Sequence, residues 1–410
     1  MEATAAAPSR ARVLQAFRSR DFRLLWTGQA ISLLGDAAFL VALGWRTFTL
    51  TGSARSLGLV LTFQGVGTIS TVLLGGALAD RYDRRTMMLV SDAARFVVIG
   101  TLAVVDGTGH VSIGFLVVIA LFEGLATGFF TPALGGLIPL VVEEPGLGSA
   151  NALIGLARQT SFIIGPTVAA VLYGFAGATV VFAFNAVSYL VSFGFVRATR
   201  PRAAERATPE GTLRDIRAGI RYVTGVPWLW VTICLFAFVL MFQWAPIQVL
   251  TPALVREHFG LGVRAYGLVF SAIGAGMVIG SVLVAQLNLH RRRGLISYLI
   301  WILNSVLVIV FALSPWFAVS ISAAFVRGIC IGFGVTIWET MLMQLVPQQM
   351  LSRVVSLDWF GSLGLTPFGL LLTGAVSGLA APGTLIALGA SVSICIISAG
   401  LLSKQIRTID

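Results

Sequence analysis

Residues 76–89 read GALADRYDRRTMML and connect two long apolar segments, 56–79 and 87–105. An aspartate followed by an arginine cluster in a tight polar turn can form a charge-assisted hydrogen-bond network that holds neighbouring segments together. A glycine one turn before the aspartate would let two helices approach closely. Positive charge that merely anchors a loop would explain the arginines, but not the glycine and the aspartate at these offsets. We therefore predict a gating-loop motif formed by Gly76, Asp80, Arg81, Asp83, Arg84 and Arg85.

The composition extends this interpretation from one loop to the whole chain. Of the 410 residues, 57% are apolar and only 11% are charged, and the mean hydropathy is +0.92. A soluble globular protein carries roughly 25% charged residues, so an ordinary soluble enzyme is excluded. Apolar segments close to the roughly 20 residues that cross a bilayer recur along nearly the full length. The sequence therefore predicts an all-α integral membrane protein.

The apolar segments divide into two halves of six spans each. The twelve predicted spans are 24–50, 56–79, 87–105, 112–141, 150–174, 178–196, 228–255, 265–289, 295–313, 316–346, 351–376 and 383–402. The stretch between the halves is polar and contains seven arginines, and from Thr212 its apolar residues recur at the spacing of an amphipathic surface helix. The predicted organisation is an N-terminal segment (1–23), a six-helix bundle (24–196), a basic linker (197–227), a second bundle (228–403) and a tail (404–410).

The distribution of positive charge predicts the orientation in the membrane. With the N-terminus inside, 21 of the 28 Lys and Arg residues lie on the cytoplasmic side, three lie outside and four lie within spans. We therefore expect both termini in the cytoplasm. The same anchors explain the net charge of +11, so we expect no nucleic-acid partner. Arginine outnumbers lysine 27 to 1, which favours a GC-rich bacterial genome and hence a bacterial inner membrane.

The two halves also resemble each other in sequence. The run LGLV at 57–60 and the run YGLV at 266–269 are each followed by two glycines at equal spacing, with an offset of 209. Repeated halves of six spans are typical of transporters that bind their substrate near the bilayer midplane, between the halves. We therefore predict two pseudo-symmetric six-helix bundles that work by alternating access.

Charged residues within the spans point to the mechanism. Each costs at least about 2.5–3.5 kcal/mol at the bilayer centre and usually faces a polar cavity. Burial favours the neutral form of a carboxyl group and a nearby arginine favours the ionised form, so a carboxyl group that moves between these settings exchanges a proton. Asp36 and Glu123 lie near mid-membrane and are the leading candidates, with Arg158 or Arg327 as the counter-charge. The proton-coupling candidates are Asp36, Glu123, Glu339, Asp358, Arg158 and Arg327.

The alternative for these charges is a permanently ionised helix pair, such as Glu123 with Arg158. Asp92 and Arg95, three residues apart on one span, are best interpreted as a local pair. Aromatic and amide side chains suit a cavity for a bulky amphiphile better than one for a sugar or an ion. The candidates for this cavity are Gln29, Trp45, Gln64, Phe129, Gln159, Gln243, Trp244 and Trp338.

The sequence gives no support for transport driven by ATP hydrolysis, for a metal or cofactor site, or for an enzyme. It contains no phosphate-binding loop of the Gly-x4-Gly-Lys-Ser/Thr type, and no polar segment is large enough for an ATPase domain. The three cysteines fall in apolar segments and the three histidines in loops, so we expect no metal site and no cofactor. No nucleophile–base constellation is present, and an enzyme is not expected.

The loop at 76–89 resembles the Gly-x-Leu-Ala-Asp-Arg-x-Gly-Arg-Arg/Lys motif of the major facilitator superfamily. Asp83 in place of the second glycine is usual in its drug–proton antiporter subgroup, which includes macrolide-efflux proteins and the enterobactin exporter. Further similar runs are FRLLWTGQAIS at 22–32, NAL at 151–153 and WET at 338–340. The resemblance implies a monomer in the lipid bilayer that exports a hydrophobic or amphiphilic small molecule, of antibiotic or siderophore type, against an inward flow of protons.

Two other functions stay open at this point. A lipid or lysophospholipid flippase could use the same fold. A membrane receptor that transports nothing belongs to a different class, and the charged residues within the spans argue against it. The fifth span gives only weak support for antiport, because around Gly165 and Pro166 the positions of the antiporter motif hold alanine or serine where four glycines are expected.

Overall fold

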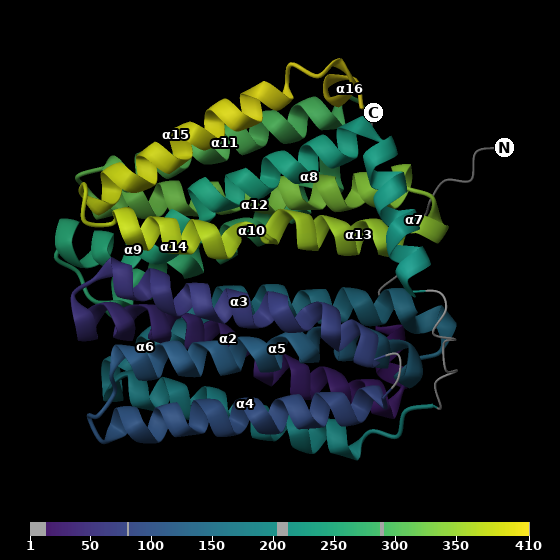
Figure 1. Ribbon diagram of the computed structural model, residues 1–410, viewed down its shortest axis with the longest axis horizontal. Helices are drawn as coiled ribbons and strands as arrows, with labels where there is room; N and C mark the ends of the chain where they lie inside the picture. The colour runs from purple at the N-terminus through teal and green to yellow at the C-terminus, as the bar shows by residue number, and fades with distance from the viewer. Residues whose placement is uncertain (1–13, 80–81, 203–211, 288–290, 410) are drawn as a thin grey trace. The chain divides into compact units, whose positions relative to one another are not determined.

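The computed structural model describes residues 14–79, 82–202, 212–287 and 291–409, and every regular element in these ranges is a helix (Figure 1). The predicted all-α class is therefore confirmed. Asp80 and Arg81 of the predicted loop motif lie outside the described residues.

The first half of the chain forms long helices at the predicted spans. The elements are η1 (Gln15–Arg18), α2 (Arg20–Thr51), α3 (Ala54–Ala79), α4 (Arg84–Gly107), α5 (Ile113–Val141), η2 (Glu144–Gly146) and α6 (Leu147–Ala198). The predicted spans 150–174 and 178–196 are continuous in α6, which is interrupted by non-helical dihedral angles at Ala176 and Gly177. Gly177 has a φ of +77°, a conformation that favours glycine, so the sequence divides α6 into two arms without a loop.

The second half contains shorter elements. They are α7 (Thr212–Gly225), α8 (Pro227–Val239), η4 (Leu240–Trp244), α9 (Ala245–Ala253), η5 (Leu254–His258), α10 (Val263–Leu287), α11 (Arg293–Leu313), α12 (Phe317–Leu345), α13 (Gln348–Leu363), α14 (Thr366–Val376), α15 (Pro382–Gly400) and α16 (Lys404–Arg407). The predicted span 228–255 runs from α8 to η5, and η4 and η5 are π-helical turns on either side of α9. The predicted span 351–376 is divided between α13 and α14.

Ten helical segments are long and apolar enough to cross a membrane, judged by length and composition over the described residues. One of them, Glu144–Ala198, includes both arms of α6. The 26-residue helix α3 is not among the ten. The predicted number of twelve spans requires α3 and each arm of α6 to cross once.

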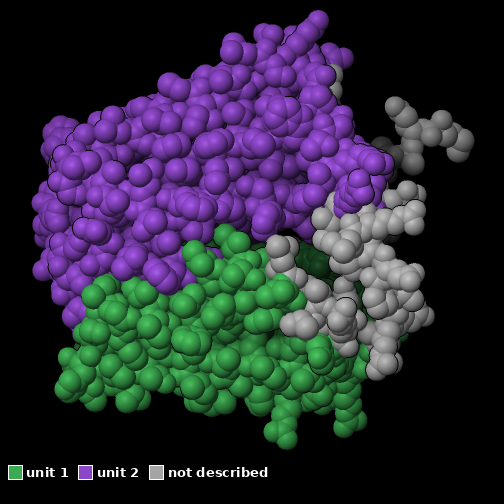
Figure 2. Space-filling view, in the orientation of Figure 1, with its two compact units in different colours: residues 1–42, 66–207 green, residues 43–65, 208–410 purple. Residues whose placement is uncertain are grey.

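The helices gather into two compact units, which Figure 2 colours separately. Unit 1 comprises residues 1–42 and 66–207, and unit 2 comprises 43–65 and 208–410. The end of α2 and the start of α3 thus belong to unit 2, where the Thr62 hydroxyl donates to the Pro367 carbonyl (3.3 Å). A Cβ atom added at Gly58 would lie 2.8 Å from the Leu370 carbonyl oxygen, so a glycine is needed for this close approach.

In unit 1, an apolar core joins the ends of α2, α4, α5 and α6. Phe22, Leu25, Met88 and Leu137 are fully buried in this cluster. Because the core fixes the starts of α2 and α4 against α5 and α6, it sets the rotation of each helix about its axis. That rotation decides which polar side chains point inward.

Candidate functional site

A buried polar cluster in unit 1 is centred on Arg95 of α4. The Arg95 Nη2 atom lies 2.5 Å from Oδ1 of Asp92, one helical turn earlier, which confirms the predicted local pair. The Arg95 Nη1 atom lies 3.9 Å from Oδ2 of Asp36 on α2. The side chains of Arg95 and Asp92 are 2% and 0% exposed, whereas that of Asp36 is 34% exposed. One arginine therefore serves two aspartates, of which only Asp36 is substantially accessible.

Two aromatic rings hold the guanidinium group of Arg95. Its carbon lies 4.0 Å from the ring centroid of Phe130 and 4.4 Å from that of Tyr189. A planar guanidinium group stacks favourably on aromatic faces, and a desolvated contact of this kind contributes about 2 kcal/mol. The two rings thus keep Arg95 in place between α5 and α6.

The two aspartates have different hydrogen-bond partners. The Tyr189 hydroxyl donates to Asp36 Oδ1 (2.5 Å) and accepts from the Asn185 amide (3.2 Å). Asp92 Oδ2 accepts from the Ser192 hydroxyl (2.8 Å), which in turn accepts from the Gln29 amide (3.2 Å). Gln29 was expected to line a substrate cavity, but it is buried and supports Asp92 through this chain.

The counter-charge of Asp36 differs from the prediction. The sequence pointed to Arg158 or Arg327, but the ion pair is made by Arg95. Arg158, in the same unit, is exposed on α6. A role for Arg327, which lies in unit 2, stays a prediction. Spacing along the chain links Arg95 only to Asp92, because the approach of α4 to α2 is a tertiary contact. The sequence did contain one indication of this role, because Arg95, like Asp36, is a charged residue near the middle of its predicted span.

The second leading proton-coupling candidate, Glu123 of α5, is also buried. Its Oε1 atom accepts from the Thr127 hydroxyl one turn later (2.8 Å).

The remaining proton-coupling candidates lie in unit 2. Asp358 and Trp338 were predicted separately, and the Trp338 indole donates a hydrogen bond to Oδ2 of Asp358 (2.9 Å). Arg327 is 5% exposed, and its Nε and Nη1 atoms have no hydrogen-bond partner among the described residues. Glu339 is exposed on α12.

The remaining predicted cavity residues fall in both units. Trp45 is buried in unit 2, and its ring centroid is 5.6 Å from that of Tyr266. Gln243 in the π turn η4 is buried and accepts from the Ser305 hydroxyl (2.6 Å). The half-buried or exposed members of the set are Gln64, Phe129, Gln159 and Trp244.

The described part of the loop motif ties α4 to its neighbours in unit 1. Arg84 donates to the Gly136 carbonyl of α5 (2.8 Å). Arg85 donates to the Val196 carbonyl near the end of α6 (3.2 Å) and also to the Arg197 carbonyl. Gly76 lies in α3, just before the gap in the description.

Asp83 caps the N-terminus of α4, because its Oδ2 atom accepts from the Thr86 amide (2.9 Å) and hydroxyl (2.7 Å). We expect Asp83→Ala to lower the stability of the folded chain by about 1 kcal/mol, the usual contribution of a lost N-cap. Asp83→Asn is the matched control, since asparagine caps equally well. Thermal denaturation in detergent measures both. An Asp83→Asn variant that unfolds as easily as Asp83→Ala would show that the charge acts in some other way.

Comparisons with known proteins agree on one family. The model of the Major Facilitator Superfamily matches residues 25–365. Macrolide efflux protein A of Streptococcus pyogenes is 22% identical over 396 residues, covering 95% of this chain and 97% of that protein. Enterobactin exporter EntS of Shigella boydii is 23% identical over 376 residues, covering 90% of each.

Solved structures show the same fold. The nucleoside transporter NupG aligns with a TM-score of 0.72 at 15% identity, covering 93% of this chain and 98% of that one. A bacterial homologue of the human lysosomal transporter Spinster aligns with a TM-score of 0.71 at 12% identity, covering 98% and 97%.

Proposed function

Because the chain belongs to the Major Facilitator Superfamily, we propose that it exports a hydrophobic or amphiphilic small molecule in exchange for protons, by alternating access. It is a multi-pass membrane transporter and not an enzyme, and its relatives include efflux proteins for macrolides and for enterobactin. The proposal places it in a bacterial inner membrane as a monomer with both termini in the cytoplasm. Its substrate is of antibiotic or siderophore type.

The observation that carries the proton coupling is the unequal setting of two aspartates around one arginine. Asp92 is fully buried and 2.5 Å from Arg95, so these two charges compensate each other. An ionised Asp36 then adds an unbalanced negative charge in a medium where such charges are costly. Taking up one proton at Asp36 makes the group of Asp36, Asp92 and Arg95 neutral. Glu123 of α5 also interacts electrostatically with Arg95, so it is a second acidic group near this site. Asp36 is also the least buried member of that group of three, with 34% of its side chain exposed.

Opposing influences act on the protonation of Asp36. Partial burial favours the neutral carboxyl group, while Arg95 at 3.9 Å and the hydroxyl of Tyr189 at 2.5 Å favour the carboxylate. A small change in solvent access or in the distance to Arg95 therefore shifts the proton equilibrium. Alternating access would bring about such a change once in each transport cycle.

The function is tested by transport into inverted membrane vesicles that contain the chain and carry an imposed proton gradient. Fluorescent macrolide and siderophore derivatives serve as substrates. We expect uptake of at least one derivative that collapses when the gradient is dissipated. Vesicles with the empty expression vector are the control. Lipid scrambling without such uptake would favour a flippase, and the absence of any gradient-dependent flux would contradict the proposal.

A further inference from the structure

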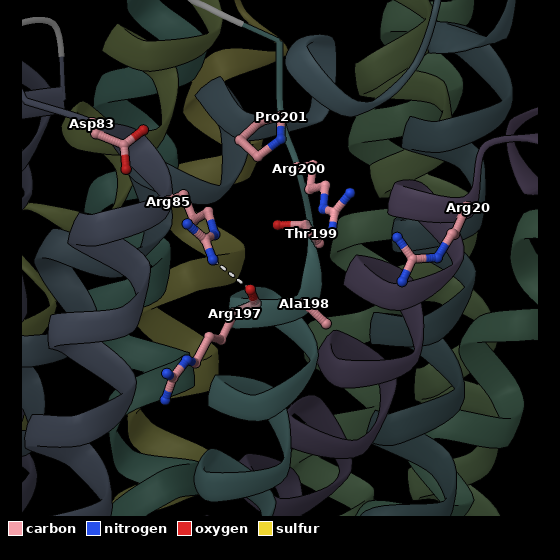
Figure 3. A pocket seen from close by; sticks show the side chains of 8 residues that line it. All are labelled: Arg20, Asp83, Arg85, Arg197, Ala198, Thr199, Arg200 and Pro201. Carbon is pink, nitrogen blue, oxygen red and sulfur yellow. Dashed lines mark hydrogen bonds between the residues drawn. The ribbon is translucent and has the colours of Figure 1, made fainter.

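A cleft of about 630 Å³ lies at the end of unit 1 where α2 and α4 begin and α6 ends (Figure 3). Four arginines contribute to its wall: Arg20, Arg85, Arg197 and Arg200. Asp83 is the acidic residue in this lining. The transport mechanism proposed above uses none of these side chains.

Little of this positive charge is neutralised. The Asp83 carboxylate is already engaged as the cap of α4 through Thr86. Arg20 lies 3.9 Å from Asp21, at the edge of ion-pair distance, and its own side chain is 63% exposed, so this pair contributes little. No carboxylate in the described part of the chain forms an ion pair with the other three arginines.

The cleft is preorganised by backbone contacts. Arg85 is held by the carbonyls of Val196 and Arg197 at the end of α6. The segment that carries Arg200 is fixed on α5, because the Arg202 amide donates to the Leu140 carbonyl (3.0 Å) and its guanidinium group donates to the Pro139 carbonyl (3.0 Å). Long flexible side chains on a mobile loop would lose more entropy on binding a ligand.

The four arginine side chains of the cleft point in different directions. In Figure 3, the Arg20 and Arg200 side chains extend toward one another beside Thr199, and Arg85 points at the Arg197 carbonyl. The Arg197 side chain points away from the other three. Arg20 and Arg200 are therefore the two arginines of this lining that face each other.

The chemistry of this pair matches a phosphate group. Guanidinium groups bind phosphate oxygens in a bidentate manner. At this end of the unit α2 and α4 present the positive ends of their dipoles and α6 presents its negative end, where Arg85 already contacts the Val196 and Arg197 carbonyls. The cleft lies at the ends of membrane-spanning helices, which is where lipid headgroups are found. Basic pockets at this depth bind anionic headgroups. We propose that the cleft binds the phosphate group of an anionic phospholipid, with Arg20 and Arg200 as its ligands.

The proposal is tested with the purified full chain in a neutral detergent, by native mass spectrometry with dioctanoyl phosphatidylglycerol. Dioctanoyl phosphatidylcholine has the same tails but no net charge. We expect saturable binding of one phosphatidylglycerol, at least about tenfold tighter than phosphatidylcholine, because charge-assisted hydrogen bonds contribute this much. The double variant Arg20→Gln/Arg200→Gln should lose this preference.

The matched control is Arg217→Gln/Arg221→Gln, which removes the same charge from exposed positions on α7 of unit 2. This control should bind phosphatidylglycerol like the unmodified chain, and gel filtration should show both double variants folded. If the two double variants lost phosphatidylglycerol binding equally, the arginines would attract anionic lipid only through their overall charge and not as a specific site. This result would overturn the proposal. Displacement of the lipid by tail-free glycerol phosphate at equal concentration would assign the cleft to a soluble phosphate ester and would also overturn it.

Discussion

Asp36→Asn is expected to stop proton-driven export while leaving the exchange of substrate across the membrane intact. Asparagine keeps the shape of the side chain and can still accept from Tyr189, but it cannot take up or release a proton. Groups that transfer protons in catalysis contribute about 100-fold or more to rate. We therefore expect uphill export in vesicles to fall by at least about this factor, with substrate–substrate exchange retained.

Two further measurements separate a coupling role of Asp36 from a structural one. Exchange by the unmodified chain should vary with pH, whereas exchange by Asp36→Asn should not. The control is Asp106→Asn on the same α4 that carries Arg95, since Asp106 accepts from Thr179 (2.6 Å) and is not part of the cluster. It should export normally. Retention of gradient-driven export by Asp36→Asn would remove Asp36 from the mechanism.

Arg95→Gln is expected to destabilise the fold more than any other change in this cluster. It leaves Asp92 fully buried without a counter-charge and removes the group that Phe130 and Tyr189 enclose. Removing one partner of a buried ion pair typically costs about 3–5 kcal/mol. Thermal unfolding in detergent should show a large fall in the transition temperature.

A second substitution tests whether the lost charge is the cause. In the double variant Arg95→Gln/Asp92→Asn, neither residue is charged, so part of the lost stability should return. The coupling energy follows from the cycle of the two single variants and the double variant. If Asp92→Asn restores nothing, the contribution of Arg95 is packing against the two rings and not charge compensation.

Several parts of this structure were predictable because the bilayer imposes them. Segments of about 20 apolar residues must be helical in lipid, where every backbone polar group needs an internal partner. The bounds of α2, α5 and α12 therefore fall close to the predicted spans 24–50, 112–141 and 316–346. The pair of Asp92 and Arg95 was predictable for a similar reason, since residues three apart share one helix face.

Local interruptions of the helices were harder to predict. The π turns on either side of α9 and the break between α13 and α14 fall within or at the edge of predicted spans, because hydropathy reports the apolar character of a span and not its pattern of backbone hydrogen bonds. Gly364 and Pro367, which lie at the break between α13 and α14, were a local signal for that break. The predicted spans 150–174 and 178–196 located the interruption of α6 but not its form, which is a bend at Ala176 and Gly177 within one helix.

The sequence by itself determined the membrane class, the superfamily and the candidate carboxylates, because hydropathy, helical spacing and a short loop motif are local properties. Only the tertiary structure decided that Arg95 meets Asp36, that Tyr189 holds the same carboxylate and that Gln29 supports Asp92. These side chains lie on α2, α4 and α6, and the contacts between them depend on how each helix is rotated about its axis. That rotation follows from the packing of whole helix faces, which no spacing within a single helix contains.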